Sequence, residues 1–242
     1  MIGGFSTRDG TLDFYLRIRS LATSDMTVLD LGAGRAAWFE DGRQDFVSSL
    51  RKMKGYVRSL IAADVDPVVM NNRACDSAVL IEEGHIPLQP DAVDLIICDF
   101  VLEHVDDPKS FIDEVERVLK PGGWFCARTP HKYCYVALLS RLLPNRFESA
   151  MLSRAQPGRK SEDVFPKRYK MNRLKNIAVL FPGWDNESFI YRSEPSYHCG
   201  RQYMYNIMDF IHRIMPAFFS GTLMIFVQKP YPRQRCDDLC ES

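Results

Sequence analysis

The feature that most constrains the fold of this chain is an alternation between two kinds of segment. Apolar runs of about four to eight residues, bounded by Gly, Pro or Asp, take turns with segments in which apolar residues recur at helical spacing. Strands that alternate with helices in this way are typical of βαβ units, which build parallel sheets. The runs are apolar throughout rather than at every second position, as in strands that are covered on both faces. The sequence therefore predicts an α/β fold.

The positions of these segments extend the prediction to a Rossmann-like, seven-stranded, mostly parallel sheet with helices on both faces. The clearest helix follows Asp107, a good capping residue, and has Pro108 at its first position. Further helices are expected at residues 44–54, 67–75, 172–180 and 201–218. The strands are expected at residues 27–31, 57–63, 78–81, 93–98, 124–128, 187–192 and 222–228.

Length and composition favour a single domain with one elaboration. The chain has 242 residues, of which 46% are hydrophobic, so we expect one full core and one domain over residues 1–242. After the fifth strand, residues 131–170 are rich in Pro, Tyr and Arg and exceed what a plain crossover needs. Long insertions of this kind are usually lids or binding elements. A surface ornament is the alternative.

Charge and cysteine content argue against several classes of protein. The 31 basic and 31 acidic side chains balance, so nothing in the net charge indicates a nucleic acid partner. The seven cysteines are scattered without the spacing of a zinc site, so we expect reduced thiols and no metal. Neither a signal peptide nor an apolar run of membrane-spanning length is visible. A cytoplasmic protein is predicted, with its oligomeric state left open.

The stretch VLDLGAGRAAW, residues 28–38, places a carboxylate and two glycines at the end of the first strand. In an open parallel sheet this turn lies at the ligand-binding crevice, where Gly32 and Gly34 let the chain turn tightly and a ligand come close. Asp30 would repel a pyrophosphate and attract an ammonium group. A dinucleotide site needs its ribose-binding acid about 20 residues further on, whereas Asp64 follows Gly34 by 30 residues. The insertion RQDFVSSLRKMKG also explains this gap, so the spacing alone does not exclude a dinucleotide.

Four stretches together carry a family resemblance: VLDLGAGRA, IAADVDP, IPLQPDAVDLIICDFVLEHV and FIDEVERVLKPGGWF. In this order they resemble a class I S-adenosylmethionine-dependent methyltransferase with a type 11-like domain. The resemblance covers residues 28–129 and implies S-adenosyl-L-methionine as the cofactor. The cofactor-binding residues that it implies are Asp30, Gly32, Ala33, Gly34, Asp64, Val65, Glu82, Glu83, Asp99, Phe100 and Glu103.

The resemblance also implies what these residues do. The glycine turn and Asp30 shape the pocket for the methionine end, and Asp64 accepts hydrogen bonds from the ribose hydroxyls. Glu82 lines the adenine pocket, or Glu83 does if the register shifts by one. Ala36 stands where the family usually has a third glycine, and its small side chain narrows the turn without blocking it. Alternatively, the glycines only permit a tight turn and Asp64 only caps a helix.

The chemistry of methyl transfer suggests candidates for a catalytic base. The reaction is an in-line displacement from a sulfonium, so the protein chiefly aligns the nucleophile. A hydroxyl nucleophile must also lose a proton, which a well-placed base accepts. The candidates are His104 in LEHV, His131 in TPHK and Asp99, each expected just beyond the end of a strand. Packing or capping is the alternative role for each histidine.

The methyl acceptor is the least determined part of the prediction. The fourth strand is not followed by the proline-aromatic signature of adenine-N6 and glutamine-N5 methyltransferases, which argues against DNA and glutamine side chains as substrates. A looser resemblance over residues 103–172 to bacterial proteins of sugar and polysaccharide metabolism favours O-methylation of a sugar hydroxyl, phosphate- or lipid-linked. The alternatives are C- or N-methylation of a small molecule or lipid precursor, and S-adenosylmethionine binding without turnover.

Two further segments bear on the acceptor. The elaboration and the residues after it are basic, and arginine forks suit phosphate oxygens, although a solvated surface explains the charge as well. The helix at residues 201–218 is apolar and aromatic enough to touch lipid headgroups, but we expect it to pack on the sheet. The candidate phosphate-binding residues are Arg154, Arg159, Lys160, Lys167, Arg168, Lys170, Arg173 and Lys175.

Overall fold

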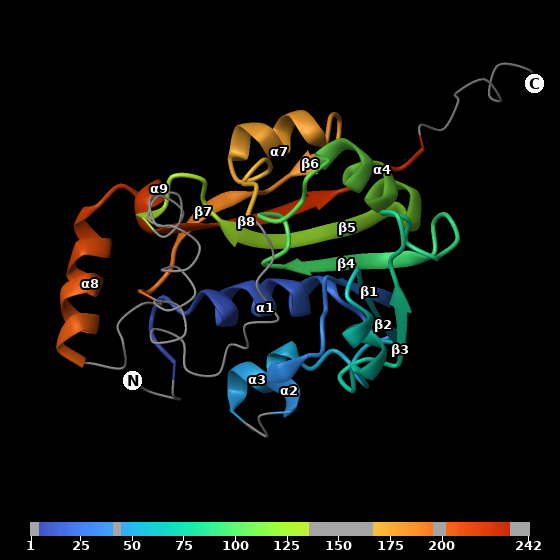
Figure 1. The fold of residues 1–242 in the computed structure, drawn as a ribbon, viewed down its shortest axis with the longest axis horizontal. Coiled ribbons are helices and arrows are strands. Elements are labelled where there is room, and N and C mark those ends of the chain that lie inside the picture. The colour runs from blue at the N-terminus through green and yellow to red at the C-terminus, as the bar shows by residue number, and fades with distance from the viewer. Residues whose placement is uncertain (1–4, 41–44, 136–166, 196–201, 233–242) are drawn as a thin grey trace, which may run out of the picture.

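A computed structural model describes residues 5–40, 45–135, 167–195 and 202–232 (Figure 1). Its sheet follows the order β3-β2-β1-β4-β5-β8-β6, and β7 also pairs with β8. Strands β1 to β5 run parallel, and β8 is antiparallel to β5. The predicted α/β fold with a mostly parallel sheet is confirmed. The bounds are β1 Thr27–Leu31, β2 Ser59–Asp64, β3 Ser77–Leu80, β4 Val93–Asp99, β5 Leu119–Pro130, β6 Asp185–Asn186, β7 Phe189–Arg192 and β8 Gly221–Gln228.

The sheet has one more strand than the sequence predicted. The expected strand at residues 187–192 becomes two short ones, β6 and β7, both paired with β8. The fifth strand, β5, is also much longer than expected: it begins at Leu119, which pairs with Val93 of β4, and it continues beside β8 as far as Pro130. The order of the parallel strands β1 to β5 is unaffected by these differences.

The order of the strands creates a switch point between β1 and β4. The chain runs outward through β2 and β3 on one side of β1 and through β4 and β5 on the other. The carboxyl ends of these parallel strands meet at one edge, on the left in Figure 1. In open α/β sheets, ligands bind in the crevice beyond such an edge.

Helices cover both faces of the sheet, as Figure 1 shows. On one face, α4 (Pro108–Val118) and α7 (Leu174–Leu180) bury Val115 and Ile177 against the sheet. On the other face, α1 (Gly10–Leu21) buries Phe14 and Ile18 fully. The two apolar layers explain why the strands read as continuous apolar runs.

The predicted start of α4 is confirmed in detail. The carboxylate of Asp107 accepts hydrogen bonds from the backbone N–H groups of Lys109 and Ser110, at 3.1 and 3.2 Å. Pro108 occupies the first helical turn, where its missing N–H costs nothing. Asp107 therefore begins the helix immediately behind the loop that follows β4.

Two of the expected helices are shorter than predicted. Residues 44–54 give only α3 (Phe46–Arg51), and residues 67–75 give only the 3₁₀ helix η2 (Pro67–Asn71). After η2, side-chain oxygens accept hydrogen bonds from backbone N–H groups. Asn72 Oδ1 accepts one from Ala74 N at 2.8 Å, and Asp76 Oδ2 accepts one from Leu60 N at 2.8 Å. Asn and Asp side chains that bond to backbone in this way compete with helix continuation.

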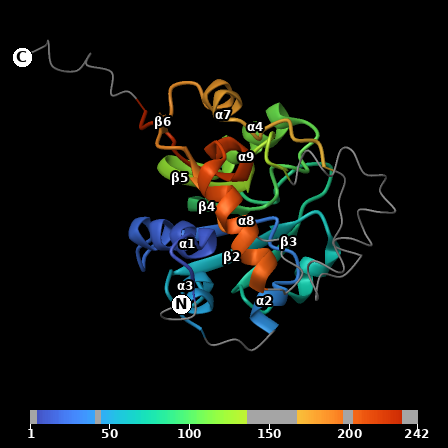
Figure 2. The ribbon, with the colours of Figure 1, turned by 90° about the vertical axis from the view of Figure 1, so that its left-hand side faces the viewer.

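The last helical segment contradicts the prediction that it packs on the sheet. It forms α8 (Gln202–Ile214) and the short α9 (Ala217–Ser220), separated at Pro216. Figures 1 and 2 show α8 beyond the carboxyl ends of the parallel strands rather than on a face, since α1 and α7 already cover both faces beside β8. Its apolar stripe is more than half exposed at Tyr203, Ile207, Phe210 and Ile214.

Polar side chains hold α8 to the rest of the molecule. Asp209 forms an ion pair with Arg8, and the ring Nδ1 of His212 lies 3.0 Å from the carbonyl oxygen of Ser193. Tyr205 donates a hydrogen bond to Glu194 at 3.3 Å. These three polar residues of the helix therefore face the rest of the molecule, whereas the four exposed apolar residues face outward.

The elaboration predicted at residues 131–170 is described only at its two ends. Residues 136–166 lie outside the described part of the chain, and with them Arg154, Arg159 and Lys160. No helix among the described residues is long and apolar enough to cross a membrane.

Candidate active site

A cavity of about 880 Å³ opens at the carboxyl edge of the parallel strands. Four segments that follow successive strands line it: residues 30–38 after β1, 64–68 after β2, 81–86 after β3 and 99–107 after β4. Side chains from α1, α3 and α4 complete its walls. The volume is within the range of sites that enclose a cofactor or a drug-sized ligand.

The turn after β1 has the backbone geometry that favours glycine. Gly32 has φ of +79°, and a Cβ built there would lie 2.1 Å from Cγ2 of Val101. Gly34 also has a positive φ, of +51°. Ala36, at the expected place of a third glycine, has φ of +53° and is buried. An alanine in this region costs roughly 1 kcal/mol relative to glycine, so the departure weakens the turn only slightly.

Hydrogen bonds fasten this turn to the end of β2. The N–H groups of Gly32 and Ala33 both donate to the carbonyl oxygen of Ala63, at 2.7 and 3.3 Å. Gly34 N donates to Asp64 Oδ2 at 2.8 Å, and Asn72 Nδ2 donates to Gly34 O at 3.0 Å. The first three amides of the turn are thus already engaged by the protein.

Asp64 ends β2 and faces the cavity. Its second oxygen, Oδ1, accepts from Asp66 N at 3.0 Å, and the residue is only 9% exposed. Each carboxylate oxygen has two acceptor positions, so one on each oxygen remains for a ligand. Val65 lies beside it with its side chain largely exposed and also lines the cavity.

Asp30 lines the cavity below the glycine turn together with Arg51 and Tyr15. Burial, and to a smaller extent the charge of Asp99, raise the pKa of Asp30 to about 7, although the charge of Arg51 partly offsets both. The charged form of this carboxyl group is therefore destabilised by its surroundings. A ligand that brings a positive charge to this position would relieve that cost.

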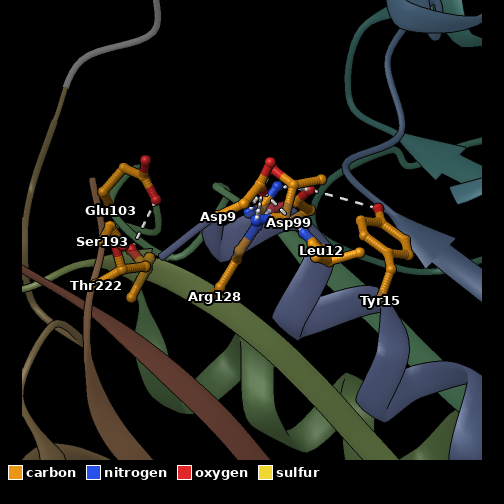
Figure 3. A network of polar contacts seen from close by, with 10 residues as sticks. Asp9, Leu12, Tyr15, Asp99, Glu103, Arg128, Ser193 and Thr222 are labelled. Atoms are coloured by element: carbon orange, nitrogen blue, oxygen red, sulfur yellow. Dashed lines mark hydrogen bonds and ion pairs between the residues drawn. The ribbon is translucent and has the colours of Figure 1, made fainter. Parts of the chain in front are cut away.

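Asp99 is held by Arg128 and is not free to act as a base. The Arg128 guanidinium binds both carboxylate oxygens of Asp99, with Nη2 to Oδ2 at 2.9 Å, and Tyr15 Oη lies 3.4 Å from Oδ2 (Figure 3). Burial raises the pKa of Tyr15, and the charge of Asp99 adds to this. A carboxylate in a two-point contact with arginine is a strong ion pair, so Asp99 is better suited to shaping the cavity than to taking a proton.

Phe100 lies in the cavity wall in a strained conformation. Its φ is +59°, which is rare for a bulky side chain. Its N–H donates to Arg128 O at 2.9 Å, and its ring lies 4.8 Å from the Arg128 guanidinium carbon. The ring is 42% exposed and lines the cavity. Backbone strain of this kind concentrates at functional sites.

The structure separates the two glutamates considered for the adenine end. Glu83 lines the cavity, with Gly84 and Ile86, whereas Glu82 does not. Glu82 instead forms an isolated bridge with His85, whose N–H donates to Glu82 O at 2.9 Å. The geometry supports the one-residue shift of register, with Glu83 in the pocket.

Of the two candidate histidines, only His104 lines the cavity. It lies in the turn after β4, where its N–H donates to Val101 O at 2.9 Å. His131 is 6% exposed and its Nδ1 accepts from Tyr133 N at 3.2 Å. Burial and the nearby Arg173 lower the pKa of His131. His131 therefore has the surroundings of a packed residue.

Glu103, which the resemblance placed among the cofactor-binding residues, does not line the cavity. Its Oε2 accepts from Thr129 Oγ1 at 2.8 Å, and Thr129 Oγ1 in turn accepts from Asn172 Nδ2 at 2.6 Å. Figure 3 shows Glu103 to one side of the group around Arg128. Burial raises its pKa to about 7, against the opposing effect of the Thr129 hydrogen bond. Its position points to a structural role.

The end of the elaboration reaches the cavity through Arg168. Arg168 N donates to Glu103 O at 2.6 Å, and its side chain lies 3.4 Å from Asp106. Lys170 Nζ also contacts Asp106, at 2.8 Å. Of the basic residues expected to meet an anionic acceptor, Arg168 is thus the described one that lines the cavity.

Comparison with known proteins agrees with this geometry. A family model described as a methyltransferase domain matches residues 29–127, and a second model of the same description matches residues 79–177. The chain therefore contains a methyltransferase domain, and its fold is that of the class I S-adenosylmethionine-dependent methyltransferases. The matched region includes the glycine turn, Asp64 and the segment after β4.

Relatives and solved structures of this methyltransferase are distant. A ubiquinone biosynthesis O-methyltransferase from Hydrogenovibrio crunogenus is 24% identical over 176 residues, which are 70% of this chain and 67% of that protein. An S-adenosylmethionine-dependent methyltransferase from Methanosarcina mazei has the same fold, with a TM-score of 0.55 and 17% identity, covering 89% of this chain and 98% of that one. The cyclase SpnF also shares it, with a TM-score of 0.56 and 14% identity over 96% and 85% of the two chains.

The cavity of the methyltransferase fits S-adenosylmethionine in charge and size. The cofactor carries an ammonium group, a carboxylate, a sulfonium and a nucleoside. The cavity wall offers Asp30 and Arg51, and the end of β2 offers Asp64 with free acceptor positions. When bound, the cofactor supplies the activated methyl group. Among the described residues, no cluster of His, Cys, Asp or Glu has the arrangement of a metal site.

The sequence left several residues of the site unnoticed. Arg51 and Asn72 come from segments that were predicted only as helices, and both lie near the glycine turn. Arg128, on β5, binds Asp99. Tyr15 belongs to α1, a helix that the sequence analysis did not predict. A polar side chain within a short apolar stretch was the available signal for Arg128, at the end of its strand. Arg51 gave no local signal, because its position depends on how α3 returns to the sheet.

Proposed function

We propose that this methyltransferase transfers a methyl group to a hydroxyl of a small aromatic molecule, with His104 as the base. The observation that carries the proposal is that His104 and the exposed ring of Phe100 line the same cavity as Asp30 and the glycine turn. An aromatic ring beside the reacting centre suits a planar acceptor. A histidine near it suits the removal of a hydroxyl proton at neutral pH.

The comparisons support this choice of acceptor over the sugar hydroxyl expected from the sequence. The relative that matches 70% of the chain is named for O-methylation in ubiquinone biosynthesis, and a quinone is a planar ring compound rather than a sugar. The wall after β4 is also apolar at Phe100, Val101 and Val105. A sugar would leave its hydroxyls facing such a wall without partners, which is unfavourable.

The residues that bind the cofactor have distinct roles in this proposal. Asp30 binds the ammonium group, Asp64 accepts hydrogen bonds from the ribose hydroxyls, and Glu83 lies at the adenine end. Phe100 and Asp99, the latter held by Arg128, shape the space between sulfonium and acceptor. Alignment of nucleophile and methyl group supplies most of the rate, on the order of 7 to 11 kcal/mol in favourable cases.

A second candidate is the phosphate- or lipid-linked sugar that the sequence favoured. Arg168 lines the cavity, and a guanidinium is a good partner for phosphate. Its contact with Asp106 already satisfies part of that charge, so an anionic acceptor would have to compete for it.

Peripheral membrane contact and a cytoplasmic location also stay predictions, as does the single domain with residues 131–170 as its elaboration.

Methyl transfer from labelled S-adenosylmethionine tests the proposal. The acceptors are a panel of phenols and catechols, a panel of nucleotide sugars, and lipid extracts. We expect turnover on the aromatic panel, and His104→Ala to lower kcat by roughly 10²- to 10⁴-fold with little change in cofactor affinity. His131→Ala is the matched control and should keep near wild-type kcat.

Each other outcome assigns a different function. If only sugars are methylated, the acceptor is a sugar and not an aromatic molecule. If the product carries its new methyl group on carbon or nitrogen, the nucleophile is not a hydroxyl. Cofactor binding with no turnover on any panel would favour a protein that binds S-adenosylmethionine without catalysis. Full activity of His104→Ala would remove the histidine from the mechanism.

A further inference from the structure

Arg168 places a positive charge on the side of the cavity that carries the proposed base. Among the described residues, three arginines line the cavity, and two of them, Arg35 and Arg51, come from the part of the chain between β1 and β2. Arg168 instead lies against the segment after β4, to which His104 and Phe100 belong. A charge at this position is suited to the methyl acceptor.

Backbone hydrogen bonds hold Arg168 beside the turn that carries His104. The N–H groups of Arg168 and Tyr169 both donate to the carbonyl oxygen of Glu103, at 2.6 and 3.1 Å. Glu103 directly precedes His104 in the chain, and its buried side chain is held by the hydroxyl of Thr129. The position of Arg168 therefore does not depend on contacts of its own side chain.

The backbone at Tyr169 buries one side chain and leaves its neighbour at the cavity. Tyr169 has φ of +53°, which is rare for a bulky residue. Its side chain is 3% exposed and packs with Cys134. Arg168, by contrast, keeps half of its side chain exposed and lines the cavity. Strain of this kind is found at ligand-binding segments more often than elsewhere.

The acid beside Arg168 is paired mainly with Lys170. Lys170 Nζ lies 2.8 Å from Asp106 Oδ1 and 2.6 Å from the backbone oxygen of Asp106, whereas Arg168 Nε lies 3.4 Å from the same Oδ1. The hydrogen bond from Lys170 is also the main reason why the pKa of Asp106 is lowered. A contact of 3.4 Å is longer than a charge-assisted hydrogen bond, so the guanidinium of Arg168 is available to a ligand.

We propose that Arg168 binds an anionic oxygen group, a carboxylate or a phosphate, on the methyl acceptor. The planar fork of a guanidinium matches two oxygens of either group. The apolar wall at Phe100 and Val101 then contacts the body of the acceptor while Arg168 binds its charge. Arg168 is thus a specificity-determining residue that favours acidic acceptors over neutral ones. This inference rests on the proposed function, which places the acceptor beside His104.

Methyl transfer to matched pairs of acceptors tests the inference. Protocatechuate, a catechol with a carboxylate, and its uncharged amide share the ring and both hydroxyls. A nucleotide sugar and the corresponding neutral sugar form the phosphate pair. The wild type should prefer the charged member of at least one pair by roughly ten- to hundredfold in kcat/KM, which is the effect of a hydrogen bond to a charged group.

Substitution of Arg168 should remove this preference. Arg168→Gln should raise KM for the charged acceptor with little change in kcat, because the lost contact is made before and during the reaction alike. Arg168→Lys keeps the charge without the fork and should keep part of the preference. Asp106→Asn removes the competing acid and should increase the preference.

The matched control is Lys109→Gln, which removes an exposed charge on α4 that does not line the cavity. It should keep the wild-type preference in both pairs. Calorimetry with S-adenosylhomocysteine measures the cofactor site separately, and Arg168→Gln should bind it like the wild type. A loss of cofactor affinity that accounts for the whole loss of activity would overturn the inference.

The remaining outcomes separate this inference from the proposed function. Equal methylation of protocatechuate and its amide, with no preference in the sugar pair, refutes the anion subsite and leaves the aromatic acceptor standing. Methylation of the nucleotide sugar alone, lost in Arg168→Gln, refutes the aromatic acceptor and leaves the subsite standing. If neither pair is methylated, calorimetry on the protein loaded with S-adenosylhomocysteine decides: tighter binding of a charged member that Arg168→Gln abolishes supports the subsite, and equal binding overturns it.

Discussion

At the scale of single residues, Asp64 shows how one carboxylate shapes two parts of the site. Its carboxylate accepts hydrogen bonds from the backbone N–H groups of Gly34 and Asp66, and it still faces the cavity with free acceptor positions. The same side chain therefore fixes the glycine turn and keeps acceptor positions at the cavity, where we propose that the ribose binds. The family resemblance implied its role, but the sequence gave no sign of its bond to Gly34.

Asp64→Ala is expected to weaken the binding of S-adenosylmethionine and of S-adenosylhomocysteine by about tenfold or more, since two hydrogen bonds to a charged acceptor are lost. 5′-Methylthioadenosine should be weakened as well, because it keeps the ribose. Calorimetry measures all three, and Asp113→Ala, an exposed acid on α4 away from the cavity, is the control. Wild-type affinity in the Asp64 variant would refute the ribose assignment.

At the scale of elements, α4 and α8 present their apolar residues in opposite ways. Ile112 of α4 is 5% exposed and belongs to the core against β4 and β5, whereas Ile207 of α8 is 52% exposed. Both helices have an apolar stripe at helical spacing in the sequence. Spacing identifies the stripe, but the partner of the stripe depends on where the helix lies.

The same substitution at these two isoleucines tests the contrast. Ile112→Ala should lower the free energy of unfolding by roughly 2 to 5 kcal/mol because it leaves a cavity in the core. Ile207→Ala should change it by less than about 0.5 kcal/mol, as surface substitutions usually do. Urea unfolding measures both. A large loss for Ile207→Ala would show that the stripe is covered in the folded protein.

At the scale of the whole molecule, Glu103 joins three distant parts of the chain. It follows β4, its side chain binds Thr129 near the end of β5, and its backbone oxygen accepts the amides of Arg168 and Tyr169. Asn172 extends this group through Thr129. The chain that returns from the elaboration is therefore anchored to a buried acid.

This acid makes stability depend on pH. Burial raises the pKa of Glu103 to about 7 from an ordinary value of 4.5. A raised pKa means that the folded protein prefers the protonated form, so this stabilisation is complete below about pH 4.5 and is lost as the pH rises through 7. Asp30 contributes with the same sign, because its pKa is also raised to about 7.

Glu103→Gln should reduce the pH dependence of the free energy of unfolding, because glutamine keeps an acceptor for Thr129 and carries no charge. Relative to the wild type, the variant should gain stability steadily between about pH 5 and pH 8. Urea unfolding across this range measures the difference, and Asp30 cancels in the comparison. Parallel curves for the two proteins would show that Glu103 is not a buried acid with a raised pKa.

The sequence by itself determined the parallel sheet, the glycine turn with Asp30 and Asp64, and the start of α4 at Asp107. These features are local, because continuous apolar runs, positive φ and helix caps are set by neighbouring residues. The tertiary structure alone decided that Arg51 faces Asp30, that Arg128 holds Asp99, that His104 and not His131 lines the cavity, and that α8 turns its apolar stripe outward. Each of these depends on contacts between segments far apart in the chain, which follow from how the elements pack rather than from spacing within any one of them.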